Sequence, residues 1–477
     1  MSLADLTAGA AGSAVWLEDA RSDRVVRRDE LAGVVERWRG HLERHGVPPG
    51  AVVGLRGTDP LAVATAWLGI LGAGRCVAPH AADLPAARLA TWQQEVSPAL
   101  LVDADQGPAG DPVPGPAVDG GGVLLTSSGT TGPPKLVRLT TPQLLHTAGS
   151  VVQAHRLTDE DRGFNPLPLH HVNAEVVGLL STLRSGGTLV LDDRFHRTGI
   201  WSLLQDREIT WLNAVPAVLA LLLRGDPPDQ PLPRLRFLRS ASAPLPAPVR
   251  EGVVALLGLP VVETYGMTEA GSQITASDLD DPVPGSVGRP VGLELRVVGD
   301  DLAPVAAGTV GKVHIRGAGV ITAYASAAGA EQITDDGWLD TGDLGSVDGS
   351  GSLFLAGRRD DVINRGGEKI FPRAVEDVLL ADPDVHGAAV VGYPDDVLGQ
   401  VPVAALVTDT DDVPALFARL DQACTERLDR VRRPARYHLL DTLPGGVNGK
   451  ISRGEVLRLL QEPGAPEGVP APGQARR

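Results

Sequence analysis

The sequence predicts an α/β fold with a large N-terminal domain, a β-rich subdomain within it, and a small α+β C-terminal domain. Helix-like and strand-like segments alternate between Ser13 and Asp105, a pattern typical of parallel strands covered by helices. From Ala276 onward short strands and turns replace this alternation, and a compact α+β pattern follows Asp360. With 477 residues the chain is too long for one domain of ordinary size, so several units are expected.

The N-terminal part begins with an amphipathic helix. Apolar residues recur on one face of Asp29–His45, which predicts a helix there, and the apolar run Pro60–Leu71 predicts a second one. Gly122–Leu125 has the pattern of a buried strand, and Pro142–His155 that of a helix capped by Thr141. Further strands and strand-to-helix passages are expected at Ala51–Leu55, Thr188–Leu191, Ile209–Leu223 and Leu235–Leu245.

The second part of the chain is expected to hold short strands and then a separate small domain. Asp340–Asp343 is expected in a turn, and strands at Leu293–Val298, Gly311–Arg316 and Ser352–Ala356. The domains expected are residues 1–359 and 360–461, followed by a Pro- and Gly-rich tail, 462–477, that is predicted to be disordered. The small domain is expected to contain Arg373–Ala381, Ala388–Gly392, Val401–Val407, Val413–Leu428, Tyr437–Leu440 and a helix at Arg453–Leu460.

Composition limits the possible partners and locations. The formal net charge is -16, and no basic cluster is dense enough to follow a nucleic-acid backbone, so nucleic acid is not expected as a partner. The two cysteines, Cys76 and Cys424, lie far apart, which disfavours disulfides and zinc. No run approaches the roughly 18 apolar residues of a membrane span, and no signal peptide is evident, so a cytoplasmic protein is expected.

The segment Thr126–Arg138, TSSGTTGPPKLVR, is the strongest single signal of function. Its five hydroxyl side chains, two glycines and Lys135 offer donors without bulk, so backbone amides can approach an anionic group. It is not the common phosphate loop, because Lys135 stands three residues beyond Gly132, and Pro133 and Pro134 oppose a helix start. A mobile phosphate-binding flap is expected, and an ordinary surface loop is the alternative.

Other polar side chains follow expected strands. The stretches LRFLRSASAPL, residues 235–245, and PVVETYGMTEA, residues 260–270, place polar groups where open α/β sheets bind ligands. FNPLPLHH ends at His171 and precedes an apolar helical run that carries Asn173 and Glu175. A histidine here is more often a packed core residue than a functional one. A carboxylate in such a run needs a partner, because its burial is otherwise costly.

Five motifs together resemble those of the superfamily of adenylate-forming enzymes, which comprises acyl-CoA synthetases, adenylation domains of peptide synthetases and luciferases. TSSGTTGPPKLV is similar to the phosphate loop of that superfamily, ETYGMTEA to its adenine-and-magnesium motif, LDTGD to its ribose motif, GRRDDVI to its hinge and LPGGVNGKI to its catalytic-lysine loop. One such motif is weak evidence, but five in the correct order are specific. The resemblance covers nearly the whole chain and implies ATP and Mg²⁺ as cofactors.

The resemblance implies a set of ATP-binding residues. Glu269 would supply an oxygen ligand for Mg²⁺, and Thr268 a hydroxyl contact to phosphate. Tyr265 would offer its ring to adenine, while Asp343 would accept the ribose hydroxyl hydrogens and Arg358 would reach the same sugar. The full implied set is Thr126, Ser127, Ser128, Gly129, Thr130, Thr131, Gly132, Lys135, Ser242, Ala243, Pro244, Glu263, Thr264, Tyr265, Gly266, Met267, Thr268, Asp343, Arg358 and Lys450.

Catalysis is assigned by the same resemblance to Lys450, with Thr268 and His171. A cation between the attacking oxygen and the α-phosphate stabilises charge where the transition state develops it. In the family the small domain turns about the position of Asp360 after adenylation and opens a channel for a thiol. The residues expected to line that channel are Gly366, Gly367 and Glu368.

Within the superfamily the chain looks most similar to oxalate- and malonate-type CoA ligases, through PLHHVNAEVVGLLSTL, TWLNAVPAVLALLL, LRFLRSASAPL and GSVGRPVG. His171 matches the residue that gates the acyl pocket, whereas Asn173 and Ala174 replace a common His-Gly pair and Glu175 stands where an apolar residue is usual. Glu175 would attract an amine, so an amino-bearing acid is one hypothesis. The expected acid pocket, too polar for a long-chain fatty acid, comprises His170, His171, Asn173, Glu175, Ser240, Gly266, Ser272 and Gln273.

The leading hypothesis is ATP-dependent adenylation of a small polar or aromatic carboxylic acid, followed by transfer to CoA. One alternative is a stand-alone enzyme that loads the phosphopantetheine of a carrier protein. Another is a diazotase, which activates nitrite for reaction with an aryl amine. A non-enzymatic interaction protein is disfavoured because Lys450, Glu269 and Asp343 are all present.

Overall fold

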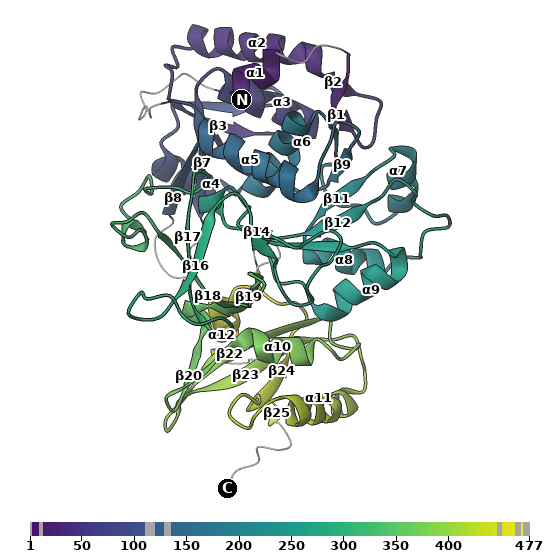
Figure 1. The fold of residues 1–477 in the computed structure, drawn as a ribbon, viewed down its shortest axis with the longest axis vertical. Coiled ribbons are helices and arrows are strands. Elements are labelled where there is room, and N and C mark those ends of the chain that lie inside the picture. Colours follow the sequence, from purple (N-terminus) through teal and green to yellow (C-terminus); the bar gives the residue numbers. More distant parts are fainter. Residues whose placement is uncertain are drawn as a thin grey trace.

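The structure is a computed structural model that describes residues 2–8, 13–109, 120–127, 135–445, 451–462 and 469–470. A large N-terminal body and a small C-terminal one follow each other along the long axis (Figure 1). Among the described residues, three sheets belong to the large body and one to the small body. The predicted fold class, α/β with a β-rich subdomain and a small α+β C-terminal domain, is confirmed.

The largest sheet has the strand order β15-β14-β13-β12-β11-β9-β10-β1-β2. Its central strands, from β13 to β1, run parallel, so their carboxyl ends meet at one edge. Its strands are β1 (Val15–Asp19), β2 (Val25–Arg27), β9 (Arg162–Asn165), β10 (Thr188–Leu191), β11 (Trp211–Ala214), β12 (Phe237–Ser240), β13 (Val261–Tyr265), β14 (Thr275–Ala276) and β15 (Arg289–Pro290).

A second sheet carries the phosphate-loop hairpin. Its strand order is β6-β5-β3-β4-β7-β8. Strand β7 pairs antiparallel with β8, and the last pair before the connection is Ser127 with Lys135. The expected phosphate loop is therefore the connection of this hairpin. The strands are β3 (Val52–Arg56), β4 (Cys76–Pro79), β5 (Leu100–Asp103), β6 (Gly107–Ala109), β7 (Gly122–Ser127) and β8 (Lys135–Thr140).

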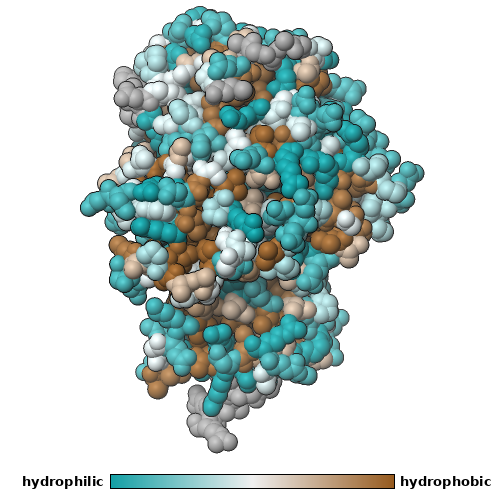
Figure 2. All heavy atoms as spheres, in the orientation of Figure 1, coloured by the Kyte–Doolittle hydropathy of each residue, from teal (hydrophilic) through white to brown (hydrophobic). Residues whose placement is uncertain are grey.

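Helices cover both sheets, as their apolar faces predict. The core between the sheets joins buried residues of α2 and α3 to buried residues of β3 and β7. The helices of the large body are α1 (Leu3–Ala8), α2 (Leu31–Arg44), α3 (Pro60–Gly72), α4 (Ala86–Val96), α5 (Thr141–His155), α6 (Ser181–Ser185), α7 (Ile200–Asp206), α8 (Pro216–Leu223) and α9 (Ala247–Leu257). Figure 2 shows apolar surface over α8 and α9, where Leu221 and Val254 are exposed.

Two local expectations about helices need correction. The cap of α5 is Thr140, not Thr141: the Thr140 hydroxyl accepts from the Gln143 amide at 3.4 Å, and Gln143 Oε1 accepts from the Thr140 amide at 2.8 Å. This reciprocal pair satisfies two backbone donors at once, which explains the choice of cap. The run after His171 begins as a π-helix, η2 (Asn173–Leu180), before α6.

The β-rich subdomain is an antiparallel sheet in the order β16-β17-β18-β19. Asp340–Asp343, expected in a turn, lies inside the long strand β18, because β17 and β19 pair with it on both sides. Gly342 has a φ of 73°, which allows a local bend within β18. This bend explains why the segment has the composition of a turn. The strands are β16 (Glu294–Val298), β17 (Gly311–Arg316), β18 (Leu339–Val347) and β19 (Leu353–Arg358).

The C-terminal body starts after the short 3₁₀ turn η5 (Arg359–Asp361). Its sheet runs β21-β20-β23-β24-β25, with β22 paired to β23. Val469–Pro470, in the tail expected to be disordered, forms β25 along β24, and most of that tail lies outside the described residues. The elements are β20 (Ile363–Arg365), β21 (Glu368–Ile370), α10 (Pro372–Leu379), β22 (Gly387–Asp395), β23 (Gly399–Val407), α11 (Val413–Arg427), β24 (Arg436–Leu439), α12 (Arg453–Gln461) and β25 (Val469–Pro470). None of the described helices is long and apolar enough to cross a membrane.

Candidate active site

Three expected ATP-binding residues meet where β13, β18 and β19 end or bend. The Tyr265 hydroxyl donates to Asp343 Oδ2 at 2.6 Å, and Arg358 Nη1 donates to Asp343 Oδ1 at 3.2 Å and to the Thr341 carbonyl at 3.0 Å. Burial, and then the charge of Asp343, raise the pKa of Tyr265 well above its usual value, so this hydroxyl keeps its proton. The arrangement holds a carboxylate beside a buried aromatic ring.

A second chain of contacts joins Lys135, from the phosphate-loop hairpin, to Glu269. Lys135 Nζ donates to Gln332 Oε1 at 2.8 Å, and the Tyr324 hydroxyl lies 2.7 Å from the same oxygen and 3.1 Å from Glu269 Oε1. Tyr324 has one hydroxyl proton for two acceptors, so it can donate fully to only one of them. Burial and the charge of Glu269 raise the pKa of Tyr324.

The donor set around Glu269 suits Mg²⁺. Glu269 lies in the 3₁₀ turn η3 (Thr268–Ala270) and is 6% exposed, so it offers a buried carboxylate oxygen, the ligand that Mg²⁺ prefers. Thr268 stands next to it with its hydroxyl. Tyr324 and Gln332 were not predicted from the sequence, because Tyr324 lies in an irregular segment and Gln332 in the short 3₁₀ turn η4 (Ala330–Gln332), and only the fold brings them to η3.

The backbone is unusual at two expected site residues. Ser242 and Ser272 have φ values of 73° and 69°, a left-handed conformation that is uncommon outside glycine and collects at ligand-binding sites. Beside them, a Cβ on Gly266 would lie 2.2 Å from the Ser272 carbonyl oxygen, so only glycine permits this approach. These three residues therefore fix the main chain at the carboxyl ends of β12 and β13.

Two expected pocket residues converge on Arg239, which the sequence analysis did not select. Arg239 Nη1 donates to Asn173 Oδ1 and to Asn213 Oδ1, both at 3.0 Å, and Nη2 donates to Gln273 Oε1 at 3.2 Å. Asn173 also lies 3.4 Å from the Ser242 hydroxyl. The structure thus brings Asn173, Gln273 and Ser242 into one polar cluster, built around a buried guanidinium.

Glu175 faces away from that cluster, toward α3. It is fully buried, and its Oε1 accepts from Trp67 Nε1 at 2.7 Å, while Oε2 has no hydrogen-bond partner among the described residues. Burial raises the pKa of Glu175 to about 8, so this carboxyl is mainly protonated at neutral pH. A protonated carboxyl next to an indole is a poor receptor for an amine.

The other expected residues of this region lie around these clusters. Glu263 pairs with Arg250 at 3.3 Å, and the Thr264 hydroxyl donates to the Ser240 carbonyl at 3.3 Å. Met267 packs against the main core. The rings of His170 and His171 lie 4.3 Å apart, and burial lowers the pKa of His170.

The expected hinge and thiol-channel residues occupy the start of the C-terminal body. Asp360 is exposed in η5, and Gly366 and Gly367, at φ 58° and 92°, form the turn of the β20–β21 hairpin, with Glu368 at the start of β21. Next to Asp360, Asp361 pairs with Arg453 at 2.9 Å, and Arg453 also pairs with Glu376 at 2.7 Å. Arg453 therefore joins the base of α12 to the hinge segment.

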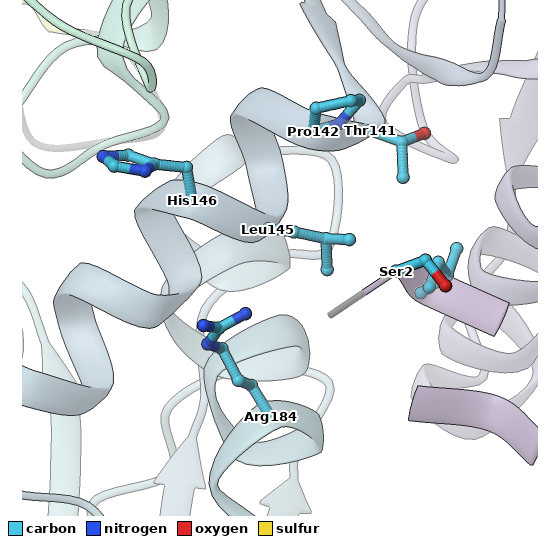
Figure 3. A pocket seen from close by; sticks show the side chains of 7 residues that line it. Ser2, Thr141, Pro142, Leu145, His146 and Arg184 are labelled. Atoms are coloured by element: carbon cyan, nitrogen blue, oxygen red, sulfur yellow. The ribbon is translucent and has the colours of Figure 1, made fainter. Parts of the chain in front are cut away.

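Several expected residues lie outside the described residues. They are Lys450 and Ser128 to Gly132, and Ser127 is described by its backbone. A pocket of about 520 Å³ lies beside α5 and α6. Its lining includes His146 and Arg184 and none of the expected site residues (Figure 3). The acidic group Asp192, Asp193 and His196 contains none of the expected site residues, and in it Asp192 pairs with Arg21 at 2.5 Å.

Comparison with known proteins decides the family. A family model described as AMP-binding enzyme matches residues 112–325, and one described as AMP-binding enzyme C-terminal domain matches residues 374–450. The sulfoacetate–CoA ligase of Cupriavidus necator is 39% identical over 372 residues, which cover 76% of this chain and 70% of that enzyme. The chain belongs to this family. It is an AMP-forming acid–CoA ligase.

Two further relatives of this ligase extend the comparison. The oxalate–CoA ligase of Saccharomyces cerevisiae is 34% identical over 336 residues, which cover 69% of this chain and 62% of the yeast enzyme. The structure of the o-succinylbenzoate–CoA synthetase of Bacillus subtilis in complex with ATP and a magnesium ion is 26% identical, with a TM-score of 0.82 over 95% of this chain and 98% of that chain.

Proposed function

We propose that this ligase forms the CoA thioester of a small polar or aromatic carboxylic acid in two steps at one site. In the first step a carboxylate oxygen attacks the α-phosphorus of ATP, which gives acyl-AMP and releases pyrophosphate. In the second step the thiolate of CoA attacks the acyl carbon and AMP leaves. Because the first step joins two anions, the site must neutralise charge and hold an in-line geometry.

The observation that carries this proposal is the junction of Tyr265, Asp343 and Arg358. A buried ring and a carboxylate held at 2.6 Å from its hydroxyl offer a face for adenine and acceptors for the two ribose hydroxyls. Arg358, already bound to Asp343, is placed to contact the same sugar. Ser242, Ala243 and Pro244 would present their backbone to the edge of the adenine.

The phosphates would lie between the β7–β8 hairpin and η3. Lys135 supplies a cation on one side, and Glu269 would hold Mg²⁺ on the other, with Thr268 donating its hydroxyl to a phosphate oxygen. When bound, Mg²⁺ supplies charge neutralisation to the phosphate oxygens. Lys450 is proposed to neutralise charge between the attacking oxygen and the α-phosphate, and His171 to close the acyl pocket.

The C-terminal body is proposed to rotate between the two steps. Residues 360–461 would turn about Asp360 after adenylation, which withdraws Lys450 and brings the β20–β21 hairpin, with Gly366, Gly367 and Glu368, to the path of the thiol. Arg373 and Asp377 of α10 lie close enough to Glu263 to perturb its carboxyl, so α10 borders the ATP-binding body. A cytoplasmic location remains a prediction.

The test is a product analysis with the full chain, ATP and Mg²⁺. Carboxylic acids are offered with CoA, or with a carrier protein that bears phosphopantetheine, and nitrite is offered with an aryl amine in place of the acid. The proposal predicts an acyl-CoA product and one AMP per thioester. Thioester on the carrier protein alone, or a diazonium product from nitrite alone, would contradict it.

A further inference from the structure

One segment of the chain, residues 321–332, touches both the expected metal site and the phosphate hairpin. We call it the bridging segment. The Ile321 amide donates to the Glu269 carbonyl at 2.9 Å, which fixes the start of the bridging segment to η3. The Ala325 amide donates to the Leu136 carbonyl at 2.8 Å, which fixes it to β8. The main chain of the bridging segment is therefore held at both places.

Tyr324 lies between these two backbone contacts, and its hydroxyl reaches side chains on both sides. It lies 3.1 Å from Glu269 Oε1 and 2.7 Å from Gln332 Oε1. The same oxygen of Gln332 accepts from Lys135 Nζ at 2.8 Å. One hydroxyl thus stands between the carboxylate expected to bind Mg²⁺ and the amide that holds the lysine expected to bind phosphate.

The side chain of Lys135 is packed against the bridging segment. Its Nζ lies 5.6 Å from the centre of the Tyr324 ring. Gly329 has a φ of 92°, and a Cβ on it would lie 3.0 Å from Lys135 Cδ and from two ring atoms of Tyr324. A larger residue there would be strained and would press on both side chains. The bridging segment, and not β8 alone, therefore sets where the lysine amine lies.

Because the Tyr324 hydroxyl has one proton, a change at Glu269 affects Gln332. A carboxylate oxygen that ligates a cation is a weaker hydrogen-bond acceptor, because the cation draws its electron density. With Glu269 so engaged, Tyr324 donates to Gln332 and fixes the amide that holds Lys135. Lys135 has three N–H donors and uses one of them for Gln332, so two remain for phosphate oxygens.

We propose that Tyr324 is a positioning residue that couples the metal site to the phosphate site, so that Mg²⁺ and the phosphates of ATP bind cooperatively through its hydroxyl. This inference rests on the proposed function and deepens it. Tyr324 acts on Glu269 directly and on Lys135 through Gln332. Such coupling is reciprocal, since each ligand tightens the binding of the other by the same factor. AMP has no β- or γ-phosphate to meet Lys135, so its binding is outside the coupling.

The first test measures nucleotide binding without turnover. Dissociation constants of ATP and AMP are measured by calorimetry in the absence of acid substrate, with Mg²⁺ and with EDTA, for the unaltered protein and for Tyr324→Phe, which keeps the ring. The Mg²⁺ factor is the ratio by which Mg²⁺ tightens ATP binding. Coupling through Tyr324 predicts that this factor falls roughly 10-fold in Tyr324→Phe, the value of one hydrogen bond to a charged group, with Kd for AMP unchanged.

Tyr393→Phe is the matched control, because it removes a hydroxyl from a partly buried tyrosine of β22 in the C-terminal body. An unchanged Mg²⁺ factor in Tyr324→Phe, or equal weakening of ATP and AMP, overturns the inference and leaves the ligase function standing. ATP binding without acid-dependent pyrophosphate release overturns the proposed function. Absence of ATP binding from the unaltered protein overturns both proposals.

The second test asks whether Tyr324 acts through Gln332. Gln332→Leu removes the shared acceptor, and the double variant is compared with the two single variants. Because both substitutions break the same chain of contacts, the double variant should lose no more of the Mg²⁺ factor than the weaker single variant does. Losses that multiply would show that the two side chains act independently. Chemical unfolding of the same proteins without ligands is the second readout, and a Mg²⁺ factor that falls only in step with stability contradicts a positioning role.

Discussion

Arg453 Nη2 lies 2.7 Å from Glu376 Oε2, and Nη1 of the same guanidinium lies 2.9 Å from Asp361 Oδ2. One arginine thus connects α12, α10 and the turn that joins the two bodies of the molecule. Glu376 Oε1 also accepts from the Val390 amide at 2.8 Å, so this carboxylate is fully enclosed by partners.

Removing Arg453 should destabilise the C-terminal body. Arg453→Met leaves the buried Glu376 without its cation, and loss of one member of a buried pair costs about 3 kcal/mol. Chemical unfolding of the full chain measures this loss. Arg458→Met, on the same helix but exposed, is the control, and equal unfolding free energies for the two variants would show that the buried pair contributes nothing.

Substitution of Asp361, beside the expected hinge residue Asp360, should affect thioester formation more than acyl-AMP formation. Asp361→Ala removes the contact from the hinge to Arg453 but leaves Glu376 in place, so acyl-AMP formation should remain near its normal rate while thioester formation changes severalfold. Single-turnover measurements with and without CoA separate the two rates. If both steps change equally, the Asp361–Arg453 contact has no part in moving between them.

Substitution of Asp343, the expected ribose contact, tests the nucleotide site. Asp343→Asn removes one of the two acceptor positions and the charge, so kcat/KM for ATP should fall roughly 10- to 100-fold, the value of a charge-assisted hydrogen bond. The variant should also lose discrimination between ATP and 2′-deoxy-ATP. The exposed Asp281→Asn variant should retain both properties, and a normal ATP preference in Asp343→Asn would exclude Asp343 from the ribose site.

Substitutions of Lys135 and of Gln332 should raise KM for ATP by different factors, although the two side chains are hydrogen-bonded to each other. Lys135→Met removes a cation from the phosphates and should raise KM for ATP roughly 10- to 100-fold, whereas Gln332→Leu removes only the anchor of the amine and should raise it about 3- to 10-fold. Lys312→Met, which breaks an ion pair with Asp300 far from η3, is the control. Equal and small effects of the Lys135 and Lys312 changes would place the phosphates elsewhere.

Burial of Glu175 makes stability depend on pH in a defined direction. Its pKa is raised from 4.5 to about 8, so its contribution to stability is fully present below about pH 4.5 and is lost as the pH rises toward 8. Relative to Glu175→Gln, the unaltered protein should lose about 1.4 kcal/mol of unfolding free energy per pH unit in this window. Exposed Glu160→Gln is the control. A difference between the two proteins that is independent of pH would contradict a raised pKa at Glu175.

The elements and the site differ in how far the sequence predicts them. Periodicity predicts α2 closely because its apolar face repeats at helical spacing, and the continuous apolar run of α3 predicts a buried helix. It places Asp340–Asp343 in a turn and not in β18, because the partners β17 and β19 are distant in sequence. The capping threonine of α5 is misplaced by one residue, since Thr140 and Thr141 have the same local signal.

The same distinction applies to the site. Tyr265, Asp343 and Arg358 belong to motifs, and the fold brings them into contact as those motifs imply. Gln332 belongs to no motif, and Arg239 lies inside the quoted stretch LRFLRSASAPL without a role assigned to it there; the contacts of both come from neighbours on other strands and loops. An arginine inside a short apolar strand is the one signal that could have pointed to Arg239, since a charge there must be paired or functional.

The measurement that tests the central claim most directly is acid-dependent pyrophosphate release from ATP, made with the full chain and with Lys450→Ala. The account predicts release only when a carboxylic acid is present, conversion of the adenylate to an acyl-CoA thioester when CoA is added, and a fall in release of roughly 100-fold or more in the Lys450→Ala variant. Release that needs no carboxylic acid, or release that Lys450→Ala leaves unchanged, would contradict it.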